Sequence, residues 1–256
     1  MAAQQSRDHD PEVVEQGDIY FFYRPKVETD QAAGLEDVQR FHIVLRPHGR
    51  QLFRLITIGR KRLPDIGEHE RTWGFVDMVA ASAREIERAL REQTYETKTR
   101  GTRTRPAARP AGEGVYAFVR AGNKLFLAYQ LELPRKPGEV QQELKIPPAG
   151  SFAISIKNPE ASTPPGVGLR KEEEADYPKS LQREFRGRRF ATEDIRLLDY
   201  PGAEFVIVGA RLNPERELGI ELEAENETPE TADIFRKLHI DRSRHPIEPL
   251  LEGEWR

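Results

Sequence analysis

Residues 72–98 read TWGFVDMVAASAREIERALREQTYETK, and this stretch decides the fold class that the sequence predicts. Aromatic and β-branched residues are concentrated at 72–79, which favours a strand. A helix is expected at 82–93. The side chains at 94–100 then alternate along the chain in the way expected of a strand with one buried face. The stretch therefore predicts a helix placed between two strands.

The helix is the best-supported element of this stretch. Ser82 and Glu85 have the three-residue spacing of a capping box, in which each side chain satisfies a backbone N–H of the first turn. Ile86, Ala89 and Leu90 recur at helical spacing and form an apolar stripe. The helix is therefore expected to pack one face against a sheet.

The pattern recurs further along the chain at a constant offset of 54 residues. The matched positions are Phe75 with Tyr129, Glu85 with Glu139, Ile86 with Val140, and Leu90 with Leu144. This recurrence predicts a duplicated strand–strand–helix–strand unit at 53–100 and 114–157. The alternative is that two such stretches share a period without sharing an origin. The predicted fold class is α+β, with twisted, mainly antiparallel sheets and helices on one side.

Composition shifts divide the chain into three parts. Residues 1–16 are polar and are expected to form a disordered tail. Residues 17–158 hold the predicted duplicated core. Residues 159–256 begin with a stretch rich in Pro, Gly and Glu, and are expected to form an acidic α+β segment packed on that core.

The composition excludes several classes of protein. The 256 residues include no Cys, which excludes disulfides, thiolate metal sites and a cysteine nucleophile. The sequence has no apolar run of the length needed for a transmembrane helix, and residues 1–16 lack the apolar core of a secretory signal. A soluble cytoplasmic protein without a membrane partner is expected.

Charge is distributed unevenly along the chain. Residues 38–109 hold 16 Lys and Arg against 8 Asp and Glu, a net charge of +8, whereas the rest of the chain has a net charge of −11. Such asymmetry is typical of proteins with an anion-binding face. The alternative is that the two regions neutralise each other across one folded surface.

Two acid-free runs within the basic region, at 38–64 and 98–112, contain the predicted anion-binding residues. They are Arg60, Lys61 and Arg62 in one segment, and Lys98, Arg100, Arg103 and Arg105 in the other. Arg and Lys side chains would contact phosphate oxygens, and Trp73 and Phe75 could stack on bases if they are not part of the core. The leading hypothesis is a non-enzymatic binding protein for a polyanion such as nucleic acid. A homo-oligomeric protein–protein adaptor is the rival, and no cofactor is expected.

One pattern favours an enzyme instead. Pro64-Asp65 followed by Glu96-Thr97-Lys98 is similar to the PD-(D/E)xK nuclease motif. The resemblance implies that Asp65 and Glu96 hold Mg²⁺ and that Lys98 helps to position the attacking water. The match is short, and here a helix separates the two parts, whereas the nuclease family usually joins them by a hairpin. No Gly-rich phosphate loop, G-x-S-x-G elbow or H-E-x-x-H motif is present.

Three longer strings resemble an uncharacterised family of bacterial proteins. They are GDIYFFYRPKV at 17–27, GRKRLP at 59–64 and YETKTRG at 95–101. The resemblance spans most of residues 17–210. It implies a bacterial cytoplasmic protein, and it implies no activity, cofactor or functional residue.

Overall fold

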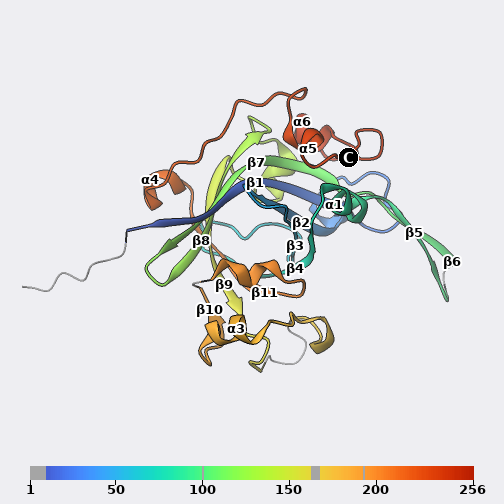
Figure 1. Cartoon of the computed structure of the whole chain (residues 1–256). Helices are drawn as coiled ribbons and strands as arrows, with labels where there is room; N and C mark the ends of the chain where they lie inside the picture. The colour runs from blue at the N-terminus through green and yellow to red at the C-terminus, as the bar shows by residue number, and fades with distance from the viewer. Residues whose placement is uncertain (1–9, 100, 163–167, 193) are drawn as a thin grey trace, which may run out of the picture.

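Antiparallel strands dominate the computed structural model of the protein, which describes residues 10–99, 101–162, 168–192 and 194–256 (Figure 1). Eight of them form a closed barrel in the order β9-β11-β4-β3-β2-β1-β7-β8, and β8 pairs with β9 to complete the circle. The barrel strands are β1 (Glu12–Pro25), β2 (Val38–Pro47), β3 (Phe53–Ile58), β4 (Arg71–Ala80), β7 (Arg109–Ala121), β8 (Lys124–Leu133), β9 (Ala149–Lys157) and β11 (Glu204–Arg211).

Alternation along each strand fills the inside of the barrel. In β1, Ile19, Phe21 and Tyr23 join the interior apolar cluster, whereas Tyr20 and Phe22 belong to a second cluster on the outer wall. An eight-stranded barrel has an interior just wide enough for side chains to fill. Here the buried side chains of the interior cluster fill it, so ligand sites are to be sought on the outside.

Apolar side chains close one end of the barrel, and a buried ion pair closes the other. At one end, Leu63 and Ile66 from the loop between β3 and β4 join the interior cluster. This loop lies against β11 at Gly209, where a Cβ would come within 2.4 Å of the Asp65 carbonyl oxygen, so only glycine fits. At the other end, the buried side chain of Arg54 pairs with Glu15.

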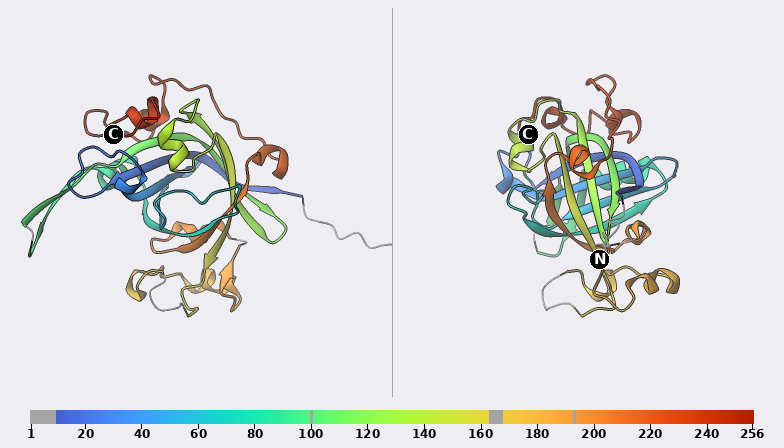
Figure 2. Two further views of the ribbon diagram at one scale, coloured as in Figure 1. Left: turned by 180° about the vertical axis from the view of Figure 1, so that it is seen from behind. Right: turned by 90° about the vertical axis from the view of Figure 1, so that its left-hand side faces the viewer.

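Short helices cover parts of the outer wall. The α-helices are α1 (Ala83–Leu90), α2 (Glu139–Glu143), α3 (Lys179–Gln182), α4 (Pro214–Leu218), α5 (Asp233–Arg236) and α6 (Glu248–Leu251), and the 3-10 helices are η1 (Leu35–Asp37), η2 (Lys171–Glu173), η3 (Arg183–Phe185) and η4 (Ile195–Asp199). The C-terminal segment, orange to red in Figure 2, runs over the barrel and carries α4, α5 and α6. No described helix is both long and apolar enough to cross a membrane.

Two further strands form a separate ribbon. Among the described strands, β5 (Gln93–Thr97) and β6 (Gly101–Arg105) pair only with each other, and they extend away from the barrel in Figures 1 and 2. The base of this ribbon is tied to the loop after β1, where the Glu28 N–H donates to the Thr104 carbonyl oxygen. The ribbon therefore projects from the barrel as an arm.

The predicted α+β fold class is wrong, because the protein is mostly β and only 18% helical. The predicted open sheets close into one barrel. The two predicted units contain only two short helices, α1 with eight residues and α2 with five. Alternation indicates strands and their faces, but it does not indicate that the first and last strands of a sheet meet.

Strand order also contradicts the predicted duplication. After α2, β9 returns to the barrel and pairs with β8, but after α1 the chain enters β5, which pairs with β6 outside the barrel. On the side away from β3, strand β4 pairs with β11 and not with the strand that follows α1. Strand β11 lies beyond the predicted boundary at 158/159. Strand β1 likewise begins at Glu12, within the predicted tail.

Candidate anion-binding site

The first predicted basic segment lies in the loop between β3 and β4. Arg62 pairs with Glu70 through Nη1 and Oε2, which are 2.7 Å apart, and Arg60 pairs with the same carboxylate. The hydrogen bond from Arg62 lowers the pKa of Glu70 to about 2, and Arg60 adds to this effect. Lys61 has no ion-pair partner in the described parts of the chain. Arg60 remains 59% exposed and can still meet a ligand.

The second predicted basic segment lies in the β5–β6 ribbon. Arg103 pairs with Glu28 at 2.9 Å, and Arg105 lies over the ring of Tyr95 at 5.6 Å. Lys98 is exposed, and Arg100 lies outside the described residues. Since the ribbon points away from the barrel while the 59–62 loop lies on it, the structure does not bring the two segments together.

The predicted nuclease residues also lie apart. Asp65 pairs with Lys145 at 2.9 Å beside the barrel mouth. Glu96 and Lys98 are in the ribbon, where Glu96 accepts a hydrogen bond of 2.5 Å from Thr102. No group of three or more potential metal ligands occurs among the residues that the structure describes. The geometry therefore offers no shared Mg²⁺ position for Asp65 and Glu96.

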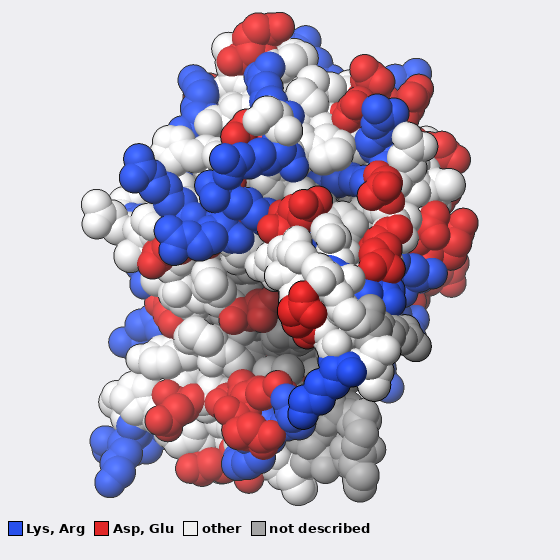
Figure 3. Space-filling model, turned by 90° about the vertical axis from the view of Figure 1, so that its right-hand side faces the viewer, with Lys and Arg blue, Asp and Glu red and all other residues white. Residues whose placement is uncertain are grey.

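Part of the basic region is neutralised by acids from elsewhere in the chain. Arg46 pairs with Asp18 at 2.6 Å, and both Arg50 and Arg54 pair with Glu15 and Asp199. On the face from which the ribbon points, Lys and Arg side chains nevertheless gather in one area, and Asp and Glu in others (Figure 3). An anion site must therefore be found among the arginines that remain uncompensated.

Three arginines and two aromatic rings line a pocket of about 470 Å³ on the outer wall. Its lining residues are Arg60, Arg71, Thr72, Trp73, Arg189, Phe190 and Val206. None of them is acidic. Neither Arg71 nor Arg189 has an ion-pair partner within the described ranges. The pocket therefore carries an uncompensated positive charge beside aromatic surface.

The strands explain how these residues meet. In β4, Val76 points into the barrel core, so alternation places Arg71 and Trp73 on the outer wall. Val206 of β11 is paired with Trp73. The short strand β10 (Phe190–Ala191) pairs with the end of β9 and brings Arg189 and Phe190 to the same wall.

The two rings form an open aromatic surface. The ring centroids of Trp73 and Phe190 are 6.2 Å apart, and their planes are inclined by 37°. The guanidinium of Arg189 lies 5.7 Å from the Phe190 centroid, within the range of a cation–π contact. Both rings are half-buried, so each keeps part of its surface accessible. The arrangement can accept a flat ring and an anionic group side by side.

The sequence indicated only part of this pocket. Arg60 was a predicted anion ligand, and Trp73 was a candidate stacking residue. Arg189 and Phe190 were missed, because more than a hundred residues separate them from Trp73 and only the barrel topology brings them together. The local signal was the run Gly187-Arg188-Arg189-Phe190, in which basic and aromatic residues adjoin a turn.

Comparisons with known proteins add no relative: no family model, curated protein or solved structure matches this chain.

Proposed function

We propose that this protein binds nucleic acid without acting on it, and that single-stranded bases stack in the pocket of Trp73 and Phe190. The observation that carries the proposal is the acid-free lining, in which three arginines surround two aromatic rings. Every base has a flat face, so stacking on aromatic side chains requires no particular sequence.

Arginine chemistry supports a phosphate-bearing partner. A guanidinium presents several N–H donors in one plane and can contact two phosphate oxygens at once. Arg71 and Arg189 are exposed and free to turn toward a backbone that passes the pocket. Arg60 is paired with Glu70, so it contributes less to phosphate binding than Arg71 and Arg189 do.

The β5–β6 ribbon offers a second, more extended contact. Lys98 and Arg105 are attached to an arm that projects into solvent, with Tyr95 exposed beside them. Such residues would hold phosphates through salt-dependent contacts, while the pocket holds bases.

Tryptophan fluorescence provides a direct test. The sequence has two Trp, so a Trp255→Phe protein reports on Trp73 alone. Titration with oligothymidylate should quench this fluorescence. Trp73→Ala removes this reporter, so its binding is followed by the anisotropy of a labelled oligothymidylate, and it should be weaker by about 1–3 kcal/mol, or roughly 5- to 150-fold in Kd.

Charge reversal in and outside the pocket provides the control. The double variant Arg71→Glu/Arg189→Glu should bind more weakly and with a smaller dependence on salt. The matched variant Lys124→Glu/Lys179→Glu changes two exposed cations outside the pocket and should bind as the parent does. Equal binding by both double variants would contradict the proposal. Binding of inorganic phosphate with no preference for an oligonucleotide would contradict the role of the rings.

A further inference from the structure

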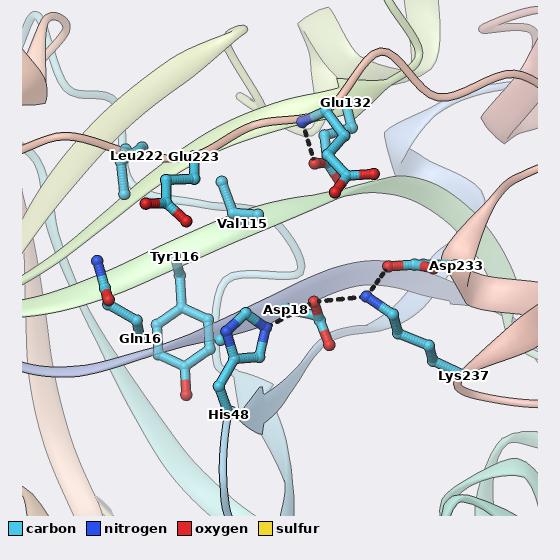
Figure 4. Close-up of a pocket in the computed structure, with 12 residues that line it drawn as sticks. Gln16, Asp18, His48, Val115, Tyr116, Glu132, Leu222, Glu223, Asp233 and Lys237 are labelled. Atoms are coloured by element: carbon cyan, nitrogen blue, oxygen red, sulfur yellow. Dashed lines mark hydrogen bonds and ion pairs between the residues drawn. The ribbon is translucent and has the colours of Figure 1, made fainter.

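A second pocket, of about 130 Å³, lies between the barrel wall and the C-terminal segment (Figure 4). Asp18 of β1 and Glu132 of β8 line it from the wall. Glu223, Asp233 and Lys237 line it from the segment that runs across the wall. The site is thus built where two distant parts of the chain meet.

Acidic groups outnumber basic ones in this lining, which holds Asp18, Glu132, Glu223, Glu225 and Asp233 against Lys237 and His48. Lys237 is already engaged, because its Nζ is 3.2 Å from Asp18 and also contacts Asp233. Arg46 adds a second cation on Asp18. The carboxylates of Glu132, Glu223 and Glu225 have no cationic partner among the described residues.

Glu132 is the group that points to a ligand. The residue is only 7% exposed, yet its side chain lines the cavity. One carboxylate oxygen accepts a 2.6 Å hydrogen bond from the Glu225 N–H, and the other has no partner in the described structure. That second oxygen faces the cavity, so an N–H donor that enters the cavity could form a hydrogen bond with it.

The pKa of Glu132 also indicates that no cation is paired with its carboxylate. Burial raises the pKa of Glu132 to about 7, and the charges of Glu227, Asp233 and Asp18 add to the effect. The Glu132 carboxyl group therefore binds a proton near neutral pH, where a paired carboxylate would have a cation beside it. A cation that enters would take the place of that proton.

We propose that this pocket binds the ammonium group of a short aliphatic amine, with Glu132 as its main acceptor. An ammonium is a compact cation with three N–H donors. It can engage the free Glu132 oxygen while Glu223 and Glu225 lie exposed at the rim, within the same lining. A second ammonium of a diamine would meet those rim carboxylates. This inference is independent of the nucleic-acid proposal.

Calorimetry and thermal unfolding test it with three probes of similar length: n-butylamine, putrescine and the neutral 1-butanol. Both amines should bind and raise Tm, putrescine more than butylamine, and butanol should do neither. Binding should tighten as pH rises through about 7, because ionised Glu132 is the form that attracts the ammonium. The groups that face Glu132 during this titration are Asp18, His48, Glu223, Glu225, Glu227, Asp233 and Lys237.

Two variants complete the test. Glu132→Gln keeps the shape of the side chain and should weaken amine binding at least about tenfold, or about 1.4 kcal/mol. Glu221→Gln alters an exposed acid of the same segment outside the pocket and should change nothing. If Glu132→Gln does not fold, the exposed pair Glu223→Gln/Glu225→Gln should abolish the extra effect of putrescine over butylamine. Equal effects of butanol and the amines, or unchanged amine binding in these variants, would overturn the proposal.

Discussion

Arg54 is a fully buried cation at one end of the barrel. Its side chain is 0% exposed, and its guanidinium lies 2.5 Å from both Glu15 and Asp199. Burial alone would lower the pKa of Arg54, but the two carboxylates outweigh it and the pKa is raised. Tyr116 also donates a 2.8 Å hydrogen bond to Glu15. One residue therefore ties β1, β3 and η4 together inside the barrel.

Replacing Arg54 by Met should destabilise the protein strongly. The change leaves two largely buried carboxylates without their buried partner, and breaking a buried pair in this way typically costs about 3–5 kcal/mol. Arg50 contacts the same two acids from the surface and is 42% exposed. Arg50→Met should therefore cost no more than about 1 kcal/mol. Urea unfolding of both variants measures the difference, and similar losses would show that burial is not what makes Arg54 important.

Helix α1 shows what local sequence can predict at the scale of an element. Ser82 and Glu85 form the predicted capping box, with the Ser82 N–H donating to the Glu85 carboxylate at 3.2 Å. Ile86 and Leu90 are buried on the outer wall as their spacing indicates. Thr228 and Pro229 have the residue types of a helix start, but the α-helix that follows them, α5, begins only at Asp233.

The β5–β6 ribbon should be dispensable for folding. Its two strands pair with each other and with no barrel strand in the described structure, so replacement of residues 95–103 by a Gly-Ser turn should leave the barrel ladders intact. Tm should change by no more than about 2–4 °C, which corresponds to about 1 kcal/mol. Oligonucleotide binding should weaken and lose part of its salt dependence, while quenching of Trp73 persists.

Thermal unfolding followed by circular dichroism gives the first readout and fluorescence titration gives the second. A much larger fall in Tm would mean that the ribbon supports the barrel through Glu28 and Arg103. Unchanged salt dependence would mean that the ribbon makes no phosphate contact.

At the scale of the molecule, closure of the barrel is the feature that sequence could not predict. The pairing of β4 with β11 joins Phe75 to Glu204, and the pairing of β8 with β9 joins Leu125 to Ile154. Alternation specifies which side of a strand is apolar, but both a sheet packed by helices and a barrel satisfy it. The arginines of the candidate pocket can be read from the sequence. Their proximity cannot be predicted, because it depends on these strand pairings.

Docking of the C-terminal segment on the barrel involves a buried carboxyl group. Glu113 is 0% exposed and accepts a 2.7 Å hydrogen bond from the Ile234 N–H at α5. Burial, together with the neighbouring Glu227, raises the pKa of Glu113 far above its usual value. The folded protein therefore keeps a proton that the unfolded chain releases above its ordinary pKa of about 4.5.

The sign of the pH dependence follows from this proton. Because the folded state binds more protons, stability should fall as pH rises from about 5 to 8. Glu113→Gln keeps the acceptor for Ile234 without an ionisable group, so its stability should fall less over the same range. Glu92→Gln, at an exposed position, is the control and should behave as the parent does. Urea unfolding at several pH values measures these slopes, and parallel slopes for all three proteins would refute the role of Glu113.

The position of β11 has a consequence for the protein as it is being made. This strand lies between β4 and β9, although both precede it by about fifty residues or more in the chain. While the ribosome is still synthesising residues 158–203, every other barrel strand has been made, but the two neighbours of β11 still present unpaired edges. Unpaired edges and exposed apolar faces are what make nascent chains aggregate. The last strand to be synthesised is therefore the one that removes the open edges, and the barrel acquires its protection from self-association in a single late step.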